Sequence, residues 1–340
     1  MKTRRFIILA VQIIVSFYTV RGNEQSTSNV VIQCPEYRAE INPAYGGNCV
    51  RLTHLPTGIE VLRAPKAVEE IAKTPLLYGM PLLFFPNRIR GGRFEFEGRT
   101  YLWPINEPER NVAIHGELHH TPFHLVGQTE GQVELEFVAT TEQPYLLFPH
   151  SFILRVCYRV DTLGLHQEVS VKNTSDSRMP FALAFHTTFN IPFVPGGNVG
   201  DVRLRLPVDS EYPRDTVQLV PTGERLTDFP LRDDLREGML QPHAHILSNF
   251  YSRYKTKEML LTDISSGWSI FYQADMNYNF WMLWNGGRRD LLTIEPQTCL
   301  IDALNVAPLT PEKEVITIEP GATVTLKTAL GVKKICPKTL

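Results

Sequence analysis

The sequence predicts an all-β protein, a large antiparallel β-sandwich with few short helices. Its apolar residues form short alternating or continuous runs, and each run is bounded by glycine, proline, asparagine or aspartate. The 25 prolines and 22 glycines are spread along the 340 residues and do not gather into a linker. Helical periodicity is scarce, so strands joined by turns should account for most of the chain.

Predicted strands follow one another along the whole chain. The alternation in 132–138 has period two, which predicts a sheet with one solvated and one buried face. The Glu-Gly-Gln sequence at 130–132 predicts a hairpin turn. Two short segments, 67–73 and 231–237, are the predicted helices. The runs predicted as strands are 29–32, 49–53, 94–96, 123–127, 133–139, 151–160, 167–173, 259–262, 268–273, 280–284, 291–294 and 323–328.

Composition narrows the class of protein. The formal net charge is −2 and no basic stripe is interleaved with aromatic residues, so we expect no nucleic-acid partner.

The apolar stretch 6–20 follows a basic start and resembles a secretory signal that ends near residue 22, although 14–20 could instead be a first strand. The stretch is short for a membrane span, so we expect no stable membrane insertion. The cysteines are single, without metal-ligand spacing, which indicates reduced thiols and leaves one disulfide open: Cys34, Cys49, Cys157, Cys299 and Cys336.

Two polar clusters lie in the first half of the chain. Asn87 and Arg88 follow an apolar run, and the planar donors of Arg88 suit sugar hydroxyls or a carboxylate, with a structural ion pair as the alternative. The second cluster lacks helical patterning and a nearby cysteine, so we expect histidines that hydrogen-bond a ligand or the backbone and no metal site. Its members are His115, His119, His120 and His124.

A third cluster contains His186, which follows the apolar run 181–185. Histidine is the side chain best suited to proton transfer near neutral pH. The alternative is a buried histidine whose hydrogen bonds are satisfied within the core.

The fourth cluster begins with Glu295, at the end of the predicted buried strand 291–294. Pro296 cannot donate a ladder hydrogen bond, so we expect the strand to fray or reach a sheet edge there. A carboxylate at the rim of a core is partly desolvated, which raises its pKa toward the range of a general base. Gln297 and Asn305 are able to hydrogen-bond and orient a neighbouring carboxylate.

Together, the four clusters resemble the aldose 1-epimerase (galactose mutarotase-like) family. Asn-Arg-Ile comes first, then His-Gly, then a His-x-x-Phe-Asn block, then Glu-x-x-Thr followed by an asparagine. The early sequence from Ala44 to His54, with its Gly-Gly turn, resembles the first hairpin of the family. The resemblance implies a galactose mutarotase-like sandwich that carries a shallow sugar cleft on one sheet.

The resemblance also implies roles for individual residues. Glu295 would be the general base at the anomeric hydroxyl, and His186 would be the general acid at the ring oxygen. We expect them to face one cleft, about one sugar ring apart. His115 and Arg88 would bind the hydroxyls of a hexose, with Asn87 in support. Gln297 is a further candidate for substrate binding, and the chemistry needs neither metal nor cofactor.

Two departures from the family leave the substrate open. The stretch 246–252 carries Asn249, and no aspartate stands where relatives contact sugar hydroxyls. The histidine block reads His-Thr-Thr-Phe-Asn, where relatives often carry proline and an aromatic residue. The alternatives are a non-catalytic carbohydrate-binding protein and an epimerase of a phosphorylated or uronic sugar. The latter needs an extra cation near the cleft, for which the candidates are Arg90, Arg93 and Arg288.

The resemblance suggests a simple domain organisation. It predicts a leader or extended start over 1–14, one sugar-processing domain over 15–333 and a tail over 334–340. Residues 16–20 resemble the opening strand of the family, which favours a cytoplasmic protein over a secreted one. The sequence leaves the oligomeric state open.

Overall fold

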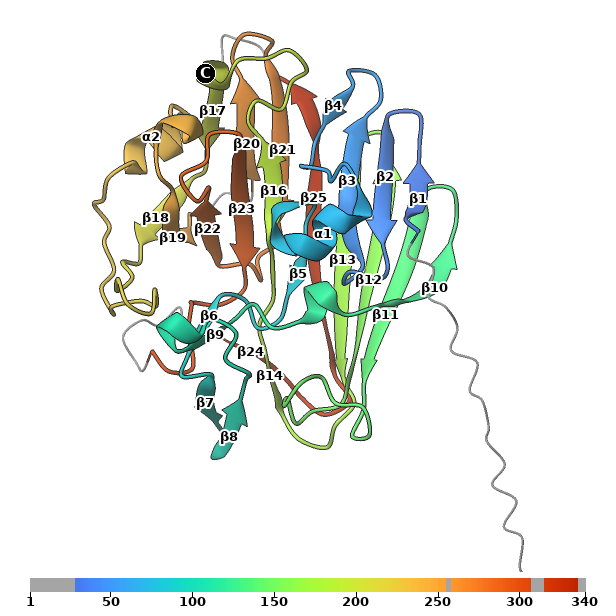
Figure 1. Cartoon of the computed structure of the whole chain (residues 1–340), viewed down its shortest axis with the longest axis vertical. Helices are drawn as coiled ribbons and strands as arrows, with labels where there is room; N and C mark the ends of the chain where they lie inside the picture. The colour runs from blue at the N-terminus through green and yellow to red at the C-terminus, as the bar shows by residue number, and fades with distance from the viewer. Residues whose placement is uncertain (1–27, 255–257, 307–314, 336–340) are drawn as a thin grey trace, which may run out of the picture.

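The computed structural model describes residues 28–254, 258–306 and 315–335, and it confirms the all-β prediction. All named strand pairs in this part of the chain are antiparallel, and the strands form two layers (Figure 1). The predicted helices are present as α1 (Val68–Lys73) and α2 (Arg232–Glu237). Short 3-10 helices join other elements: η1 (Pro75–Leu77), η2 (Pro108–Arg110), η3 (Leu118–His120), η4 (Val199–Asp201) and η5 (Pro242–Ala244).

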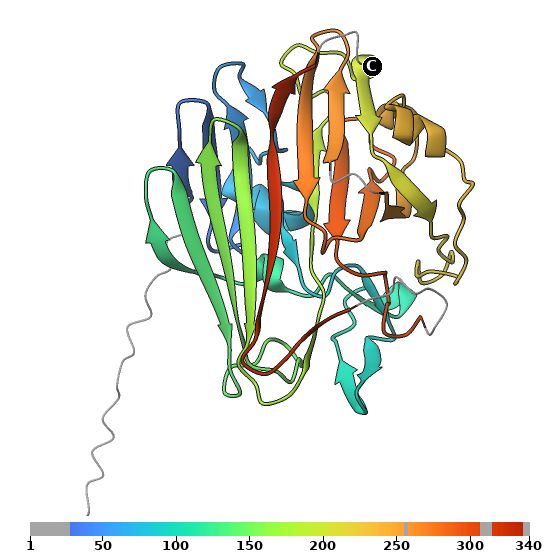
Figure 2. The ribbon, with the colours of Figure 1, turned by 180° about the vertical axis from the view of Figure 1, so that it is seen from behind.

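One layer is an eight-stranded sheet, which faces the viewer in Figure 2. Its long strands alternate buried and exposed residues, as the period-two pattern predicts. Most predicted strands of this layer are present within a few residues of their expected bounds. In spatial order the sheet contains β10 (His124–Gln128), β11 (Gln132–Ala139), β12 (Phe152–Asp161), β13 (Gly164–Asn173), β25 (Thr323–Lys334), β21 (Trp268–Ala274), β20 (Glu258–Asp263) and β17 (Val202–Arg205).

The other layer contains two sheets, which Figure 1 shows side by side. The four-stranded sheet is β1 (Val30–Gln33), β2 (Tyr37–Asn42), β3 (Asn48–His54) and β4 (Ile59–Glu60). The seven-stranded sheet is β18 (Val208–Glu211), β19 (Ser248–Arg253), β22 (Phe280–Trp284), β23 (Leu291–Gln297), β15 (Ala184–Phe185) and β5 (Leu82–Leu83), with β16 (Thr187–Asn190) also paired to β23. Three small ladders join β6 (Arg88–Arg90) to β9 (Val112–Ile114), β7 (Arg93–Phe96) to β8 (Arg99–Leu102), and β14 (Met179–Phe181) to β24 (Ile316–Ile318).

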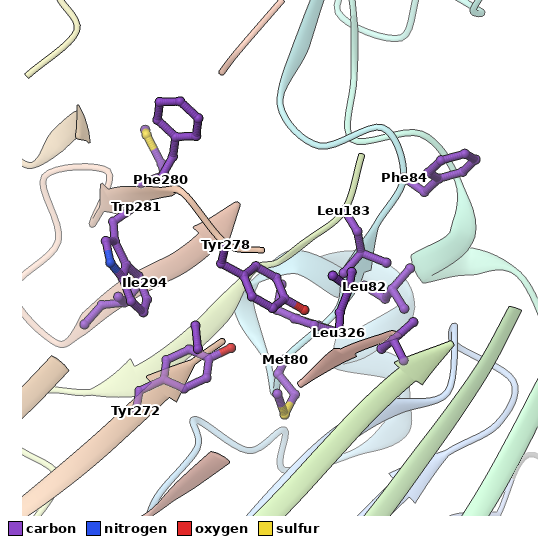
Figure 3. Close-up of a cluster of buried hydrophobic side chains, with 14 of the residues drawn as sticks. Met80, Leu82, Phe84, Leu183, Tyr272, Tyr278, Phe280, Trp281, Ile294 and Leu326 are labelled. Atoms are coloured by element: carbon purple, nitrogen blue, oxygen red, sulfur yellow. The ribbon is translucent and has the colours of Figure 1, made fainter. Parts of the chain in front are cut away.

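The main hydrophobic core lies between the eight-stranded and seven-stranded sheets (Figure 3). Tyr272 of β21 packs against Trp281 of β22 with ring centroids 5.9 Å apart, and it also meets Phe189 of β16 at 6.3 Å. Ile294 of β23 and Leu326 of β25 are fully buried in the same cluster. Because large aromatic side chains bury the most apolar area, this packing fixes β22 and β23 against the other layer.

The prediction that the strand frays or reaches a sheet edge at Pro296 is wrong, although the strand does end one residue later. Strand β23 continues to Gln297 inside its sheet, with β22 on one side and β15 and β16 on the other. Thr187 of β16 pairs with Ile294, whereas Ala184 of β15 pairs with Gln297. Pro296 therefore lies where the neighbouring strand is interrupted between β15 and β16, and its missing N–H leaves no ladder bond unmade on that side.

Several sequence predictions concern the chain ends and the cysteines. The predicted leader and the possible first strand at 14–20 lie outside the described residues. Among the residues that the structure describes, Cys34, Cys49, Cys157 and Cys299 are free thiols, and Cys336 lies outside them. No helix in the described segments is both long and apolar enough to cross a bilayer.

Candidate active site

A cleft of about 450 Å³ opens at the seven-stranded sheet and brings together most of the predicted site residues. Asn87, Arg88, His115, His186 and Glu295 all line it, although they come from four separate parts of the sequence. The ends of β22 and β23 form part of its wall, together with the segments around η1 and η3.

His186 and Glu295 form a contact across the interruption between β15 and β16. Because β15 ends at Phe185 and β16 begins at Thr187, His186 stands opposite the segment of β23 that carries Glu295. His186 Nε2 lies 3.5 Å from Glu295 Oε1, and both side chains are less than a tenth exposed. The expected spacing of about one sugar ring is therefore too large, because the irregular backbone at this interruption brings the two groups into contact.

Burial controls the protonation of the pair. It raises the pKa of Glu295 to about 8, against the opposing effect of the Gln297 hydrogen bond and the Arg214 and Arg88 charges. It lowers the pKa of His186 to about 4. Removing a charged group from water disfavours its ionised form, so carboxylic acids rise and imidazoles fall. At neutral pH, Glu295 is therefore mainly protonated and His186 is neutral.

Gln297 lies behind Glu295 and does not line the cleft. Its Nε2 donates to Glu295 Oε2 over 3.0 Å, and the side chain is fully buried. The geometry thus fits the predicted orientation of a carboxylate and does not fit direct contact with substrate. Asn305 also hydrogen-bonds a neighbouring carboxylate, but this is Asp302, to whose Oδ1 its Nδ2 donates over 2.7 Å, and not Glu295.

Asn87 fixes the orientation of His115. The backbone N–H of Asn87 donates to His115 Nδ1 over 3.2 Å, and the backbone N–H of His115 donates to the backbone oxygen of Asn87 over 3.0 Å. Since Nδ1 accepts, the neutral ring carries its proton on Nε2. Burial lowers the pKa of His115 well below its usual range, which keeps the ring neutral. His115 therefore presents a hydrogen-bond donor near His186, whose ring centroid is 5.6 Å away.

The His-Gly sequence at 115–116 has a steric cause. Both residues have positive φ, 65° at His115 and 60° at Gly116. A Cβ built on Gly116 would lie 1.9 Å from the Phe84 oxygen, so only glycine fits there. The close approach of this turn to the segment before Asn87 places His115 in the cleft.

Arg88 makes the structural ion pair that the sequence left open as an alternative to sugar binding. Its Nε and Nη2 donate to the two carboxylate oxygens of Glu107 over 2.6 and 3.0 Å. Arg110 also approaches Glu107, at 3.2 Å. Arg88 lines the cleft as well, so the ion pair holds a guanidinium in position at its wall.

The three cations that the sequence offered for a charged sugar lie elsewhere. Arg90, Arg93 and Arg288 do not line the cleft, and they pair with Asp302, Glu95 and Asp290.

The histidine cluster is divided in the structure. His119 and His120 reach the cleft, whereas His124 is exposed on β10. Ligand atoms of Glu117, His119 and His120 lie within 4.8 Å of one another, a group able to hold a metal ion. The absence of a metal from the chemistry stays a prediction.

Sequence reasoning missed several residues of the cleft. Met282 and Trp284 of β22 line it, as do Leu219 and Ser248. Trp284 ends its strand partly exposed, which offers an apolar surface to a sugar ring. Arg214 lies beside the wall and bonds to Ser248. The sequence offered one signal for these residues, the tryptophan at the end of a predicted strand. The segment around Arg214 carries no motif.

The two packed antiparallel layers form a β-sandwich of the galactose mutarotase-like class. The profile of the aldose 1-epimerase family matches residues 30–331, and the chain belongs to this family. Membership implies an isomerase that acts on carbohydrates.

Similar proteins agree with this assignment. A galactose mutarotase-like protein from Clostridium acetobutylicum has 28% identity and a TM-score of 0.85, covering 90% of this chain and 95% of its own. A GalM/aldose epimerase homologue from C. elegans has 18% identity and a TM-score of 0.72, covering 91% and 99%, and shows the fold alone. The uncharacterized protein YihR of Escherichia coli K12 is 24% identical over 231 residues, which are 67% of this chain and 71% of that protein.

Proposed function

We propose that this protein is an aldose 1-epimerase that interconverts the α and β anomers of a hexose by acid–base ring opening and reclosure. The observation that carries the proposal is the contact of 3.5 Å between His186 and Glu295 in the cleft. Mutarotation moves a proton from the anomeric hydroxyl to the ring oxygen. Because both oxygens are bonded to C1, a base and an acid that lie close together suit this reaction.

The two groups act in opposite senses in the two halves of the reaction. Glu295 takes the proton of the anomeric hydroxyl while protonated His186 gives a proton to the ring oxygen. The bond between C1 and the ring oxygen breaks, and C1 becomes a carbonyl. Rotation about the C1–C2 bond presents the opposite carbonyl face, and reclosure returns both protons. No proton is gained or lost over the cycle.

The protonation that burial favours in the pair is compatible with this cycle. Ring opening leaves Glu295 protonated and His186 neutral, which is the distribution that burial favours. A closed sugar needs the other distribution, with one proton moved between Oε1 and Nε2. New hydrogen bonds from the sugar to the carboxylate supply the stabilisation that this transfer requires.

Other cleft residues fit the binding of a sugar. His115 offers its Nε2–H, and Arg88 is held at the wall by Glu107. Trp284 lies with its ring centroid 6.1 Å from that of His186, and it suits the apolar face of a pyranose. We therefore assign substrate hydroxyls to His115 and Arg88, with Asn87 as a positioning residue.

The test is the rate of anomer exchange, followed by polarimetry on fresh α-D-glucose and α-D-galactose and by exchange NMR on D-glucuronate and D-glucose 6-phosphate. Wild-type protein should accelerate at least one sugar above its uncatalysed background. Glu295→Gln should lose about 10² or more of the rate, as expected for a general base. Glu168→Gln is the matched control, because Glu168 pairs with Lys327 away from the cleft.

Two results would overturn the proposal. One is the absence of acceleration on all four sugars while the folded protein still binds them, which would indicate a carbohydrate-binding protein. The other is full activity in Glu295→Gln, which would remove the carboxyl group from the mechanism.

A further inference from the structure

Arg214 lies in the loop after β18, beside the wall of the cleft. Its Nη2 donates hydrogen bonds to the backbone oxygen of Ser248 and, over 2.8 Å, to the Ser248 hydroxyl. Ser248 lines the cleft, as do Glu295 and Arg88, on which the charge of Arg214 acts. Arg214 is not itself a lining residue, and this contact with β19 holds its guanidinium next to Ser248, which is one.

Arg214 forms no ion pair with any carboxylate of the described residues, and its buried Nη1 has no hydrogen-bond partner there. The acidic groups near it are otherwise engaged. Glu211 accepts a hydrogen bond of 2.8 Å from Asn249, and Asp215 accepts from the backbone N–H groups of 217 and 218. A buried guanidinium donor without a partner is costly, and an incoming anion would remove that cost.

The loop that carries Arg214 is tied to η2 through Arg110. Arg110 Nη1 donates to the Val217 oxygen over 2.7 Å, and Gln218 Nε2 donates back to the Arg110 oxygen over 3.2 Å. Inside the loop, the Asp215 N–H donates to the Val220 oxygen. A cation on such a braced segment is preorganised for a ligand, which lowers the ordering cost of binding.

Arg214 differs in this respect from the other guanidinium groups near the site. Arg88 gives two of its donors to Glu107, and Arg110 shares the same carboxylate. Arg88 and Arg110 thus share an ion pair with Glu107, whereas Arg214 forms no ion pair among the described residues, although the charges of Glu295, Glu211 and Asp215 act on it at longer range. Burial lowers the pKa of Arg214 to about 10, so the group stays charged at neutral pH.

We propose that Arg214 binds an anionic substituent on C6 of the substrate, a carboxylate or a phosphate, so that the preferred substrates are acidic hexoses. This inference rests on the proposed function, because the reaction requires a free anomeric hydroxyl at C1. An anionic group is then excluded from C1, and C6 is the position that carries it through a primary alcohol or its oxidised form. The planar donors of arginine match both groups.

The electrostatics of the cleft agree with an acidic substrate. Because Glu295 is mainly protonated at neutral pH and His186 and His115 are neutral, no negative charge in the pair repels the anion. The hydroxyl of Ser248 adjoins the guanidinium and supplies a further donor to the same substituent.

The test separates binding from catalysis by the use of methyl glycosides, whose rings cannot open. Titration calorimetry would compare methyl β-D-glucuronide with methyl β-D-glucoside, for wild type, Arg214→Gln and the control Arg288→Gln. Wild type should bind the glucuronide about tenfold or more tightly, the factor expected of a charge-assisted hydrogen bond. Arg214→Gln should abolish this preference and leave the affinity for the glucoside within about twofold, while Arg288→Gln keeps the preference. A parallel titration of D-glucose 6-phosphate against D-glucose distinguishes phosphate from carboxylate.

Equal affinity of wild type for the charged and the neutral ligands in both pairs would overturn the inference. An equal loss of affinity for the charged and the neutral ligand in Arg214→Gln, with an unchanged thermal unfolding midpoint, would also overturn it. If Arg214→Gln does not fold, the wild-type comparison decides alone. The two hypotheses fail in different ways. If only the proposed function fails, the protein still prefers the anionic glycoside but does not accelerate anomer exchange. If only this inference fails, the protein still accelerates the exchange of neutral sugars but shows no preference for the anion.

Discussion

His186 Nε2 lies 3.5 Å from Glu295 Oε1, across the point where the strand that pairs with β23 is interrupted. The contact makes the two side chains one acid–base unit that holds a single proton over a wide pH range. Below the pKa of Glu295 the unit has a proton to give, and above the pKa of His186 it has a site to receive one. A unit with this property is suited to a reaction that only relocates a proton.

The pH dependence of the exchange rate should follow from these two groups. With a pKa of about 4 for His186 and about 8 for Glu295, the pair carries one proton between those values. The apparent kcat/KM should be level from about pH 5 to 7. It should fall above about pH 8, where the last proton leaves, and below about pH 4, where a second proton blocks the base. The measurement is kcat/KM from exchange NMR across this range.

An alkaline limb that begins near pH 6.5 would contradict this assignment, because an ordinary histidine would then control the rate. The wild-type thermal unfolding midpoint at each pH serves as the control, since loss of the fold must not produce either limb.

Gln297→Leu should move the alkaline limb to higher pH. The Gln297 hydrogen bond of 3.0 Å lowers the pKa of Glu295, so its removal raises that pKa further. A hydrogen bond to a charged group contributes about 1.5–3 kcal/mol, which corresponds to a shift of about one pKa unit or more. Gln273→Leu, on an exposed position of β21, is the control. An unchanged limb would show that Gln297 does not act on the carboxylate.

The fold was accessible from sequence because local signals were sufficient for it. Period-two runs and turn residues identified the long strands β11, β12 and β13, whose packing follows directly from alternation. Pro296 misled because a proline is allowed in an interior strand wherever its partner strand is interrupted, and that interruption is a tertiary feature.

The site was only partly accessible from sequence. Glu295, His186, His115, Asn87 and Arg88 lie in short motifs that come in a recognisable order, and all reach the cleft. Their separations and pKa values depend on burial and on strands from distant parts of the chain, which local patterns do not encode. Arg214 belongs to no motif, since its importance comes from a missing partner in three dimensions.

The stability of Glu295→Gln relative to wild type should be greater at alkaline pH than at acid pH. The folded-state pKa of about 8 is above the ordinary 4.5, so the folded protein binds the proton more tightly. The wild-type free energy of unfolding therefore falls as pH rises from about 4.5 through 8, by up to about 5 kcal/mol. Glutamine does not titrate, so the variant escapes this loss. Urea unfolding at pH 5.5 and 9, followed by tryptophan fluorescence, measures the difference.

A stability difference between Glu295→Gln and wild type that is the same at both pH values would contradict the raised pKa. Glu168→Gln, with a carboxyl group on the outer face of the eight-stranded sheet, should show no comparable change between pH 5.5 and 9.

Gly116→Ala should destabilise the fold far more than Gly98→Ala, although both glycines have positive φ, 60° and 76°. Alanine costs about 1 kcal/mol in either place, because a Cβ disfavours this backbone conformation. At Gly116 the new atom also lies 1.9 Å from the Phe84 oxygen, whereas at Gly98 nothing lies within 4 Å. We expect an additional loss of about 2 kcal/mol or more in urea unfolding for Gly116→Ala. Equal losses in the two variants would show that the turn yields freely and that Gly116 does not hold His115 in the cleft.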